Sequence, residues 1–169
     1  MPVFEHKADI VIIGLGNDIL RDDGVGIHIA QDLEYSFPHD IVTVKTAAVG
    51  GIDLLHLLAG HRLAIIIDAM VTGKHPPGTV LAFNAMDIPE PTEMVMSHNL
   101  HLPTAMEFGA QLGFEMPAEV KVIGIEAKDY QTFGERKEMS REVSGAMPEA
   151  KRIVGEMVQR YMEGNKQQR

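Results

Sequence analysis

Short apolar segments recur along the chain and predict a series of β-strands. Each segment is rich in Val and Ile and is bounded by Gly, Pro, Asp or Asn. Two of them, residues 10–13 and 63–67, are apolar at every position and lack the alternation of a half-exposed strand. This pattern is typical of central strands that are covered on both faces. The predicted strands are residues 9–15, 41–48, 63–69, 79–84 and 119–126.

Helical patterns occupy the intervals between these strands and the end of the chain. Apolar residues recur there at the spacing that forms one helical face, as in Val25, Ile29 and Leu33. The longest pattern begins near Ser140 and ends at Gly164, so we expect residues 164–169 to be a frayed polar tail. The predicted helices are residues 25–33, 52–59, about 99–112 and 140–163.

The alternation of strands and helices predicts an α/β fold. We expect a mostly parallel, twisted sheet of about five strands flanked by helices. One connection differs: the loop around residues 73–78 is too short for a crossover helix, so strands 63–69 and 79–84 should form an antiparallel pair. A length of 169 residues fits one domain, residues 1–169, with a core of about 9–163.

Composition narrows the classes of function. The chain has 15 Lys and Arg against 24 Asp and Glu, a net charge of −9, which disfavours nucleic acid as a partner. It has no cysteine, so a metal site must use His, Asp, Glu or Met. The N-terminus lacks an apolar signal region, and Asp9 and Asp68 interrupt the longest apolar runs, so neither secretion nor membrane spanning is indicated. We therefore expect a cytoplasmic protein.

A glycine-rich loop, GLGNDILRDDGVG at residues 14–26, follows the first strand. A dinucleotide site would need a third glycine where Ile19 stands, and a Walker A loop would need Gly-Lys-Ser/Thr. The loop instead carries Asp22 and Asp23, whose carboxylates would repel a phosphate. It is therefore suited to a cation, although one of these aspartates could simply cap the helix that begins near Gly24.

Two further candidate ligands come from separate parts of the chain. Asp68 stands at or just beyond the end of a buried strand, where open α/β sheets place ligand crevices, so Asp23 and Asp68 should face one crevice. His98 and His101 lie at a predicted helix entrance, SHNLHLP at residues 97–103, where an imidazole can point at a metal. In this entrance Ser97 or Asn99 is the expected cap, and Pro103 is expected in the first turn.

The remaining soft or basic ligand types have simpler explanations. Met94 and Met96 suit Cu(I), but methionine more often fills irregular gaps in a core, and this chain has 11 of them. Surface positions are the better interpretation for the other six histidines, which are His6, His28, His39, His56, His61 and His75.

Three separated motifs together resemble one known family. The motifs are GLGNDILRDDGVG, LAIIIDAM and SHNLHLP. Their order along the chain and the lengths of the gaps between them resemble those of the hydrogenase maturation endopeptidases. Residues 49–55 resemble that family's glycine turn into its second helix, and residues 122–126 with Phe133 and Gly134 resemble its last strand and the turn after it. The resemblance covers about residues 9–160.

The resemblance implies an activity, a partner and a metal. It implies a cytoplasmic protease that removes a C-terminal extension from the large-subunit precursor of a nickel-iron hydrogenase after nickel insertion. Carried over by position, the metal-contacting residues are Asp23, Asp68 and His98. Some members have Glu in place of Asp23, and some have an acidic, substrate-contacting residue where this chain has Thr46 and Ala47. The first departure affects how closely the carboxylate can approach a metal, and the second affects which substrate the protein selects.

Two versions of the mechanism follow from two carboxylates and one imidazole, a set that suits nickel or zinc and leaves positions open. In the first, an ion activates water or the scissile carbonyl, and Asp22 accepts the proton, so Asp22, Asp23 and Asp68 are the candidate catalytic residues. In the second, which the family favours, the nickel belongs to the substrate. Gly50 and Gly51 either admit a substrate backbone or form a simple turn.

Two rival functions remain open from the sequence. A nickel-binding delivery protein would use the same three side chains, Asp23, Asp68 and His98, without hydrolysis. A nucleotide-binding α/β module is disfavoured by Ile19 and by the aspartates of the glycine-rich loop.

Overall fold

A six-stranded sheet forms the centre of the protein. The computed structural model describes residues 7–48, 52–87, 95–96 and 102–166. The strands are β1 (Ile10–Leu15), β2 (Val42–Ala47), β3 (Leu63–Val71), β4 (Val80–Asn84), β5 (Val95–Met96) and β6 (Glu119–Glu126). The helices are α1 (Val25–Leu33), α2 (Ile52–Leu58), α3 (Leu102–Gln111) and α4 (Arg141–Lys166), with short 3-10 turns η1 (Asp22–Gly24), η2 (Ala85–Asp87) and η3 (Arg136–Glu138).

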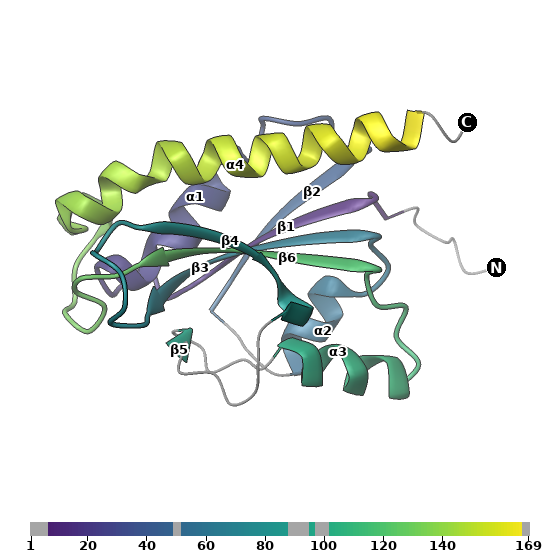
Figure 1. Cartoon of the computed structure of the whole chain (residues 1–169), viewed down its shortest axis with the longest axis horizontal. Coiled ribbons are helices and arrows are strands. Elements are labelled where there is room, and N and C mark those ends of the chain that lie inside the picture. Colours follow the sequence, from purple (N-terminus) through teal and green to yellow (C-terminus); the bar gives the residue numbers. More distant parts are fainter. Residues whose placement is uncertain (1–6, 49–51, 88–94, 97–101, 167–169) are drawn as a thin grey trace.

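The sheet is mostly parallel, as predicted. Its order is β2-β1-β3-β6-β4, and β5 pairs with the end of β3. β2, β1, β3 and β6 are parallel, whereas β4 and β5 run against their neighbours. Figure 1 shows α1 and α4 on one face of the sheet and α2 and α3 on the other. The prediction of a single α/β sheet flanked by helices is confirmed.

Each face of the sheet has its own apolar core. Ile10 and Ile12 of β1 pack into the core beneath α1 and α4, and Val11, Ile13 and Leu15 pack into the opposite one. These five side chains are at most 1% exposed, and complete burial of such a side chain stabilises the fold by about 1.5–3 kcal/mol. The absence of alternation in this strand therefore did indicate a central strand covered on both faces.

The neighbour expected for β4 was wrong, although its direction was right. β4 is antiparallel, but it pairs with β6, which lies between β3 and β4. Burial explains the order: residues 122–126 of β6 are all buried, whereas β4 is only partly buried along its length. A strand covered on both faces belongs inside the sheet, and a half-exposed strand belongs at its edge.

The connection from β3 to β4 crosses over the end of β6. Glu126, the last residue of β6, accepts hydrogen bonds from the Thr72 backbone N–H at 2.9 Å, the Thr72 hydroxyl at 2.8 Å and the Gly73 N–H at 3.0 Å. Its carbonyl oxygen accepts another from Gly78 at 2.8 Å. The buried Glu126 thus fixes the loop at the point where the loop crosses the end of β6.

The helix ends differ slightly from the predictions. α4 begins after Ser140, as expected, but continues through Gly164 to Lys166. α3 begins at Leu102 with Pro103 in its first turn, while the predicted caps Ser97 and Asn99 lie outside the described residues. In the described part of the chain, no helix is long and apolar enough to cross a bilayer.

Candidate active site

The acidic residues gather at the carboxyl edge of the sheet, beyond β1 and β3. From β1 the chain moves through α1 to β2 on one side, and then through α2 past β1 to β3 on the other. The order of the sheet therefore reverses between β1 and β3. Open α/β sheets bind their ligands outside the strand ends at such a point.

Close packing of α1 places the glycine-rich loop at this edge. A Cβ added at Gly26 would lie 2.2 Å from the Ile67 carbonyl oxygen and 2.3 Å from that of Leu15. A Cβ at Gly14 would in turn lie 2.2 Å from the Gly26 carbonyl oxygen. Gly26 thus supplies the close approach of helix and strand that the third glycine provides in dinucleotide-binding loops, at a different spacing.

Gly16 turns the loop back over η1. Its φ of +151° lies in a region that L side chains rarely adopt, and a Cβ would lie 2.1 Å from the Asp23 carbonyl oxygen. The next N–H, of Asn17, donates to that same carbonyl at 3.3 Å. This contact fixes the backbone that carries Asp23.

Asp68 lies inside β3, not at its end. The last pair between β1 and β3 is Gly14 with Ile67, so Asp68 is the first residue of β3 beyond β1. Its side chain is fully buried, and Oδ1 accepts the Ala69 N–H at 2.8 Å. The sequence prediction placed the strand end near Asp68, but pairing with β5 and β6 extends β3 to Val71.

Asp23 reaches the same place from η1, which lies against β3. Gly26, three residues later, touches the Ile67 carbonyl that directly precedes Asp68, so the two aspartates share one part of the edge. Asp23 is only 5% exposed, and its Oδ1 has no hydrogen-bond partner within the described residues. A buried carboxylate oxygen without a donor is costly, and a bound cation would relieve that cost.

Asp22 has the opposite environment, although it is the adjacent residue. It is fully buried, and its carboxylate accepts hydrogen bonds from Lys128 N–H, Asp129 N–H, Ser140 N–H and the Ser140 hydroxyl, at 2.7–2.9 Å. The predicted capping of α1 by Asp22 or Asp23 was wrong: the position before α1 is Gly24, and it has no side-chain cap. Asp22 instead ties the beginning of α4 and residues 128–129 to the acidic loop.

Arg21 strengthens the same junction from outside. Its guanidinium donates to Asp129 Oδ2 at 2.7 Å and to the Glu138 carbonyl at 2.5 Å. Its backbone N–H donates to Thr132 at 3.0 Å. Sequence reasoning missed Arg21, Ser140 and the loop after β6, because these contacts join residues more than 100 positions apart.

Several predicted site residues fall outside the described residues. These are His98, Gly50 and Gly51. The described part of the chain contains no group of three His, Cys, Asp or Glu side chains arranged to hold a metal. Thr46 and Ala47 pair with Gly14 and Leu15, so they reach the same edge as the carboxylates.

Two of the histidines predicted at the surface are buried. His28 is 6% exposed and His61 is 5% exposed. Burial lowers the pKa of His28, against the opposing effects of the hydrogen bond that its Nδ1–H donates to Gln31 Oε1 and of the charges of nearby aspartates. Burial also lowers the pKa of His61, whose hydrogen bond to the Ala8 carbonyl acts in the other direction. Both rings are therefore held toward the neutral form.

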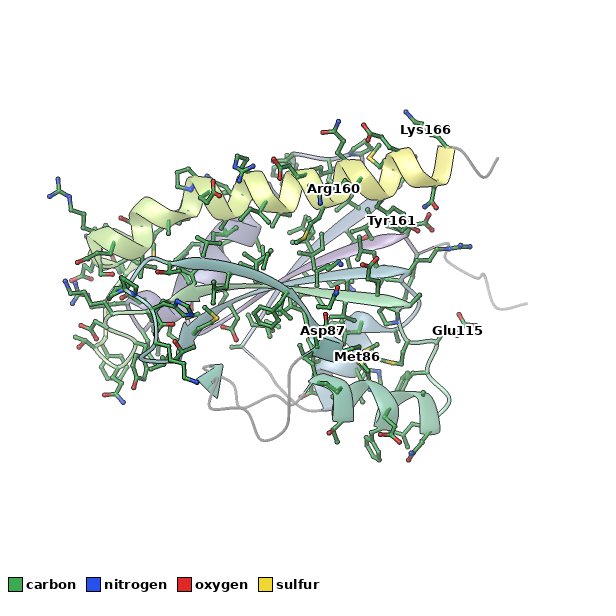
Figure 2. All side chains as sticks on the ribbon, viewed as in Figure 1. Met86, Asp87, Glu115, Arg160, Tyr161 and Lys166 are labelled. Atoms are coloured by element: carbon green, nitrogen blue, oxygen red, sulfur yellow. The ribbon has the colours of Figure 1, made fainter. Side chains whose placement is uncertain are left out.

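Two cavities in the described part of the chain lie away from the carboxylates. One, of about 410 Å³, opens between the beginning of β1 and the end of α4, where Figure 2 shows Tyr161 and Lys166. Another, of about 750 Å³, lies between η2 and α3 beside Met86 and Asp87. Neither of these two cavities is lined by Asp23 or Asp68.

Comparison with known proteins identifies the family of the chain. Residues 27–157 match the family model described as hydrogenase maturation protease. The chain belongs to the hydrogenase maturation protease family. The resemblance drawn from the three motifs is confirmed.

Individual relatives of this maturation protease cover most of its length. The hydrogenase 2 maturation protease of Escherichia coli is 30% identical over 119 residues, which are 69% of this chain and 71% of the relative. The solved [NiFe] hydrogenase maturation protease HybD of Thermococcus kodakarensis is 26% identical, with a TM-score of 0.68 over 88% of this chain and 98% of its own. The hydrogenase maturating endopeptidase HybD of E. coli, at 22% identity and a TM-score of 0.70, covers 90% of this chain and 93% of its own, and it shows the shared fold.

Proposed function

We propose that this protein is an endopeptidase that removes the C-terminal extension of a nickel-iron hydrogenase large-subunit precursor after nickel insertion. Membership of the maturation protease family supports the class of reaction. The observation that carries the proposal is the buried Oδ1 of Asp23, which has no partner among the described residues and lies at the edge where the sheet order reverses, as Asp68 does.

The nickel is assigned to the substrate. Carboxylate oxygen and imidazole nitrogen suit nickel, and a set of three such ligands leaves coordination positions for the groups that already hold the ion in the precursor. Zinc or another divalent ion would fit the same donors. Asp23 and Asp68 would then recognise a loaded precursor and orient its tail for hydrolysis.

His98 is proposed as the third contact. Met96 of β5 pairs with Met70 of β3, and this register supports the assignment. Asp68 precedes Met70 by two residues and His98 follows Met96 by two, which are the positions that an antiparallel register brings opposite each other.

Asp22 is proposed to position the site rather than to accept a proton. A general base must reach the water it deprotonates, and the Asp22 carboxylate is fully buried under four hydrogen bonds. Of the two adjacent residues, Asp23 is the better-placed catalytic carboxylate, because its Oδ1 has no donor among the residues described and can contact the nickel of the substrate. Gly50 and Gly51 are proposed to let the substrate backbone approach closely.

The test is a mass spectrum of a nickel-loaded precursor before and after incubation with the protein. Wild type should shorten the precursor, while Asp68→Ala and His98→Ala should leave it at full length. Trimming by both variants at the wild-type rate would place the protease site elsewhere. If the protein were a delivery protein, wild type would leave the precursor at full length, and the Asp68→Ala and His98→Ala variants would instead lower the nickel content of the subunit.

A further inference from the structure

Two large apolar side chains stand exposed on the loops that surround the candidate site. Ile19 lies in the glycine-rich loop and is 57% exposed, while Phe133 lies in the loop after β6 and is 76% exposed. An isolated antiparallel bridge joins Leu20 to Phe133, and the Gly134 N–H donates to the Ile19 carbonyl at 3.0 Å. We call the pair Ile19 and Phe133 the docking ridge.

The docking ridge is held by a framework of hydrogen bonds. Arg21 N–H donates to Thr132, and Asp22 N–H donates to Asp129 at 2.9 Å. The Asp22 carboxylate and the Arg21 guanidinium connect the same two loops, as described above. The exposure of Phe133 is therefore built into a fixed structure, and an apolar surface fixed in advance binds with a smaller loss of conformational entropy.

The position of the docking ridge distinguishes it from other exposed apolar side chains. Ile19 is four residues before Asp23, in the same loop. The other large exposed apolar side chains lie where an element ends near the amino edge of the parallel strands. They are Tyr35 after α1, Met86 after β4, Phe108 in the last turn of α3 and Leu112 just after α3. Of the large exposed apolar residues in the described ranges, Ile19 and Phe133 are the pair beside the carboxylates.

We propose that the docking ridge binds an apolar segment of the hydrogenase precursor next to the bond to be cut. This inference rests on the proposed function and deepens it. Asp23 and Asp68 recognise the positive charge of the substrate's metal. Ile19 and Phe133 bind apolar side chains of the substrate beside it. The acidic carboxylates attract a cation but give no preference among peptide sequences, whereas an aromatic and a branched aliphatic side chain select apolar partners.

The experiment measures trimming kinetics of the nickel-loaded precursor by mass spectrometry for Phe133→Ser, Phe133→Leu and Ile19→Ser. Phe133→Ser should raise KM about tenfold with kcat within about twofold, since it removes an apolar contact worth about one factor of ten in affinity. Phe133→Leu should restore KM to within about threefold of wild type, and Ile19→Ser should raise it about threefold. Tyr35→Ser, which removes an aromatic side chain that is 82% exposed, is the matched control and should leave KM unchanged.

Several results would overturn the docking ridge. They are an unchanged KM in both serine variants, an equal loss in Phe133→Leu and Phe133→Ser, and an equal loss in Tyr35→Ser. Thermal unfolding of each variant separates misfolding from weak binding, and Ile19→Ser and Phe133→Leu decide the matter if Phe133→Ser is unstable. Failure of the proposed function looks different, because wild type itself would then leave the precursor uncut.

Discussion

Buried side-chain polar atoms without a partner in the described structure occur at both edges of the sheet, and an uncharged ring nitrogen and a carboxylate oxygen have different consequences there. At the amino edge the atom is Nε2 of His61; at the carboxyl edge Oδ1 of Asp23 is such an atom, and Nε2 of His28, near Gly24, is another. His61 donates from Nδ1 to the Ala8 carbonyl at 2.7 Å, and burial lowers its pKa, so the ring stays neutral. A neutral ring nitrogen loses one hydrogen bond to water, whereas a buried carboxylate loses far more.

The difference supports the proposal that the carboxyl edge is the site. At the amino edge, polar side chains have hydrogen-bond partners: Lys7 donates to the Ala59 carbonyl at 2.9 Å, and Tyr161 donates to Asp9 at 3.4 Å. At the carboxyl edge, Asp22 is saturated, while the neighbouring Asp23 keeps an acceptor free of donors among the described residues. The contrast between a fully hydrogen-bonded Asp22 and an Asp23 oxygen without a donor in the described structure is the basis for proposing that Asp23 contacts a ligand.

The largest expected effect is the loss of stability when an added side chain pushes α1 away from β3 at the carboxyl edge. Gly26→Ala places a Cβ against two backbone carbonyls at 2.2 and 2.3 Å, and overpacking against backbone should cost about 3 kcal/mol or more. Urea unfolding measures the change. Gly155→Ala in α4, where an added Cβ meets nothing within 4 Å, is the control and should stabilise the protein by about 0.5–1 kcal/mol. Equal midpoints for the two variants would refute the close approach.

Neutralising the two adjacent aspartates should sharpen the contrast between them. Asp22→Asn places an amide N–H₂ among four donors, so it should lower the free energy of unfolding by about 2 kcal/mol. Asp23→Asn removes a buried charge and should leave stability unchanged or slightly raised. Urea unfolding of both variants tests this pair. A larger loss of stability in Asp23→Asn than in Asp22→Asn would contradict the assigned roles.

The smallest expected effect is a pH dependence of stability that comes from His61 at the amino edge. Because burial holds the pKa of His61 below about 6.5, the unfolded chain binds a proton that the folded chain does not, and stability falls as pH drops below about 6.5. The variant His61→Gln should weaken this dependence, and the part due to His28 should remain. His75→Gln at an exposed position should not change it. Thermal unfolding between about pH 5 and 8 gives the slopes, and identical slopes for wild type and His61→Gln would exclude the effect.

The sequence predicted those parts of the fold that depend on local pattern. Uniformly apolar β1 and β3, the beginning of α4 after Ser140 and the acidic residues near two strand ends all followed from residue types and spacing. The place of β6 between β3 and β4 did not, because strand order depends on competition among strands for the buried interior. The signal was present in the apolar run of β6, but the short loop after β3 favoured the wrong neighbour.

The site was predicted only in part for a similar physical reason. Asp23 follows β1 and Asp68 lies near the end of β3, and both strands can be recognised from their apolar pattern, so a common edge could be expected. The contacts that separate Asp22 from Asp23 come from Lys128, Asp129 and Ser140, and no local pattern connects them to the loop. The same holds for Phe133, whose place beside Ile19 depends on contacts between two loops that are more than 100 positions apart.

The most direct measurement of the central claim compares nickel-loaded and nickel-free forms of one hydrogenase precursor, each incubated with wild type and with Asp23→Asn. The mass of the precursor is followed over time. Our account predicts that wild type shortens the nickel-loaded form alone and that Asp23→Asn shortens neither. Cutting of the nickel-free form at the same rate, or cutting by Asp23→Asn at the wild-type rate, would contradict it.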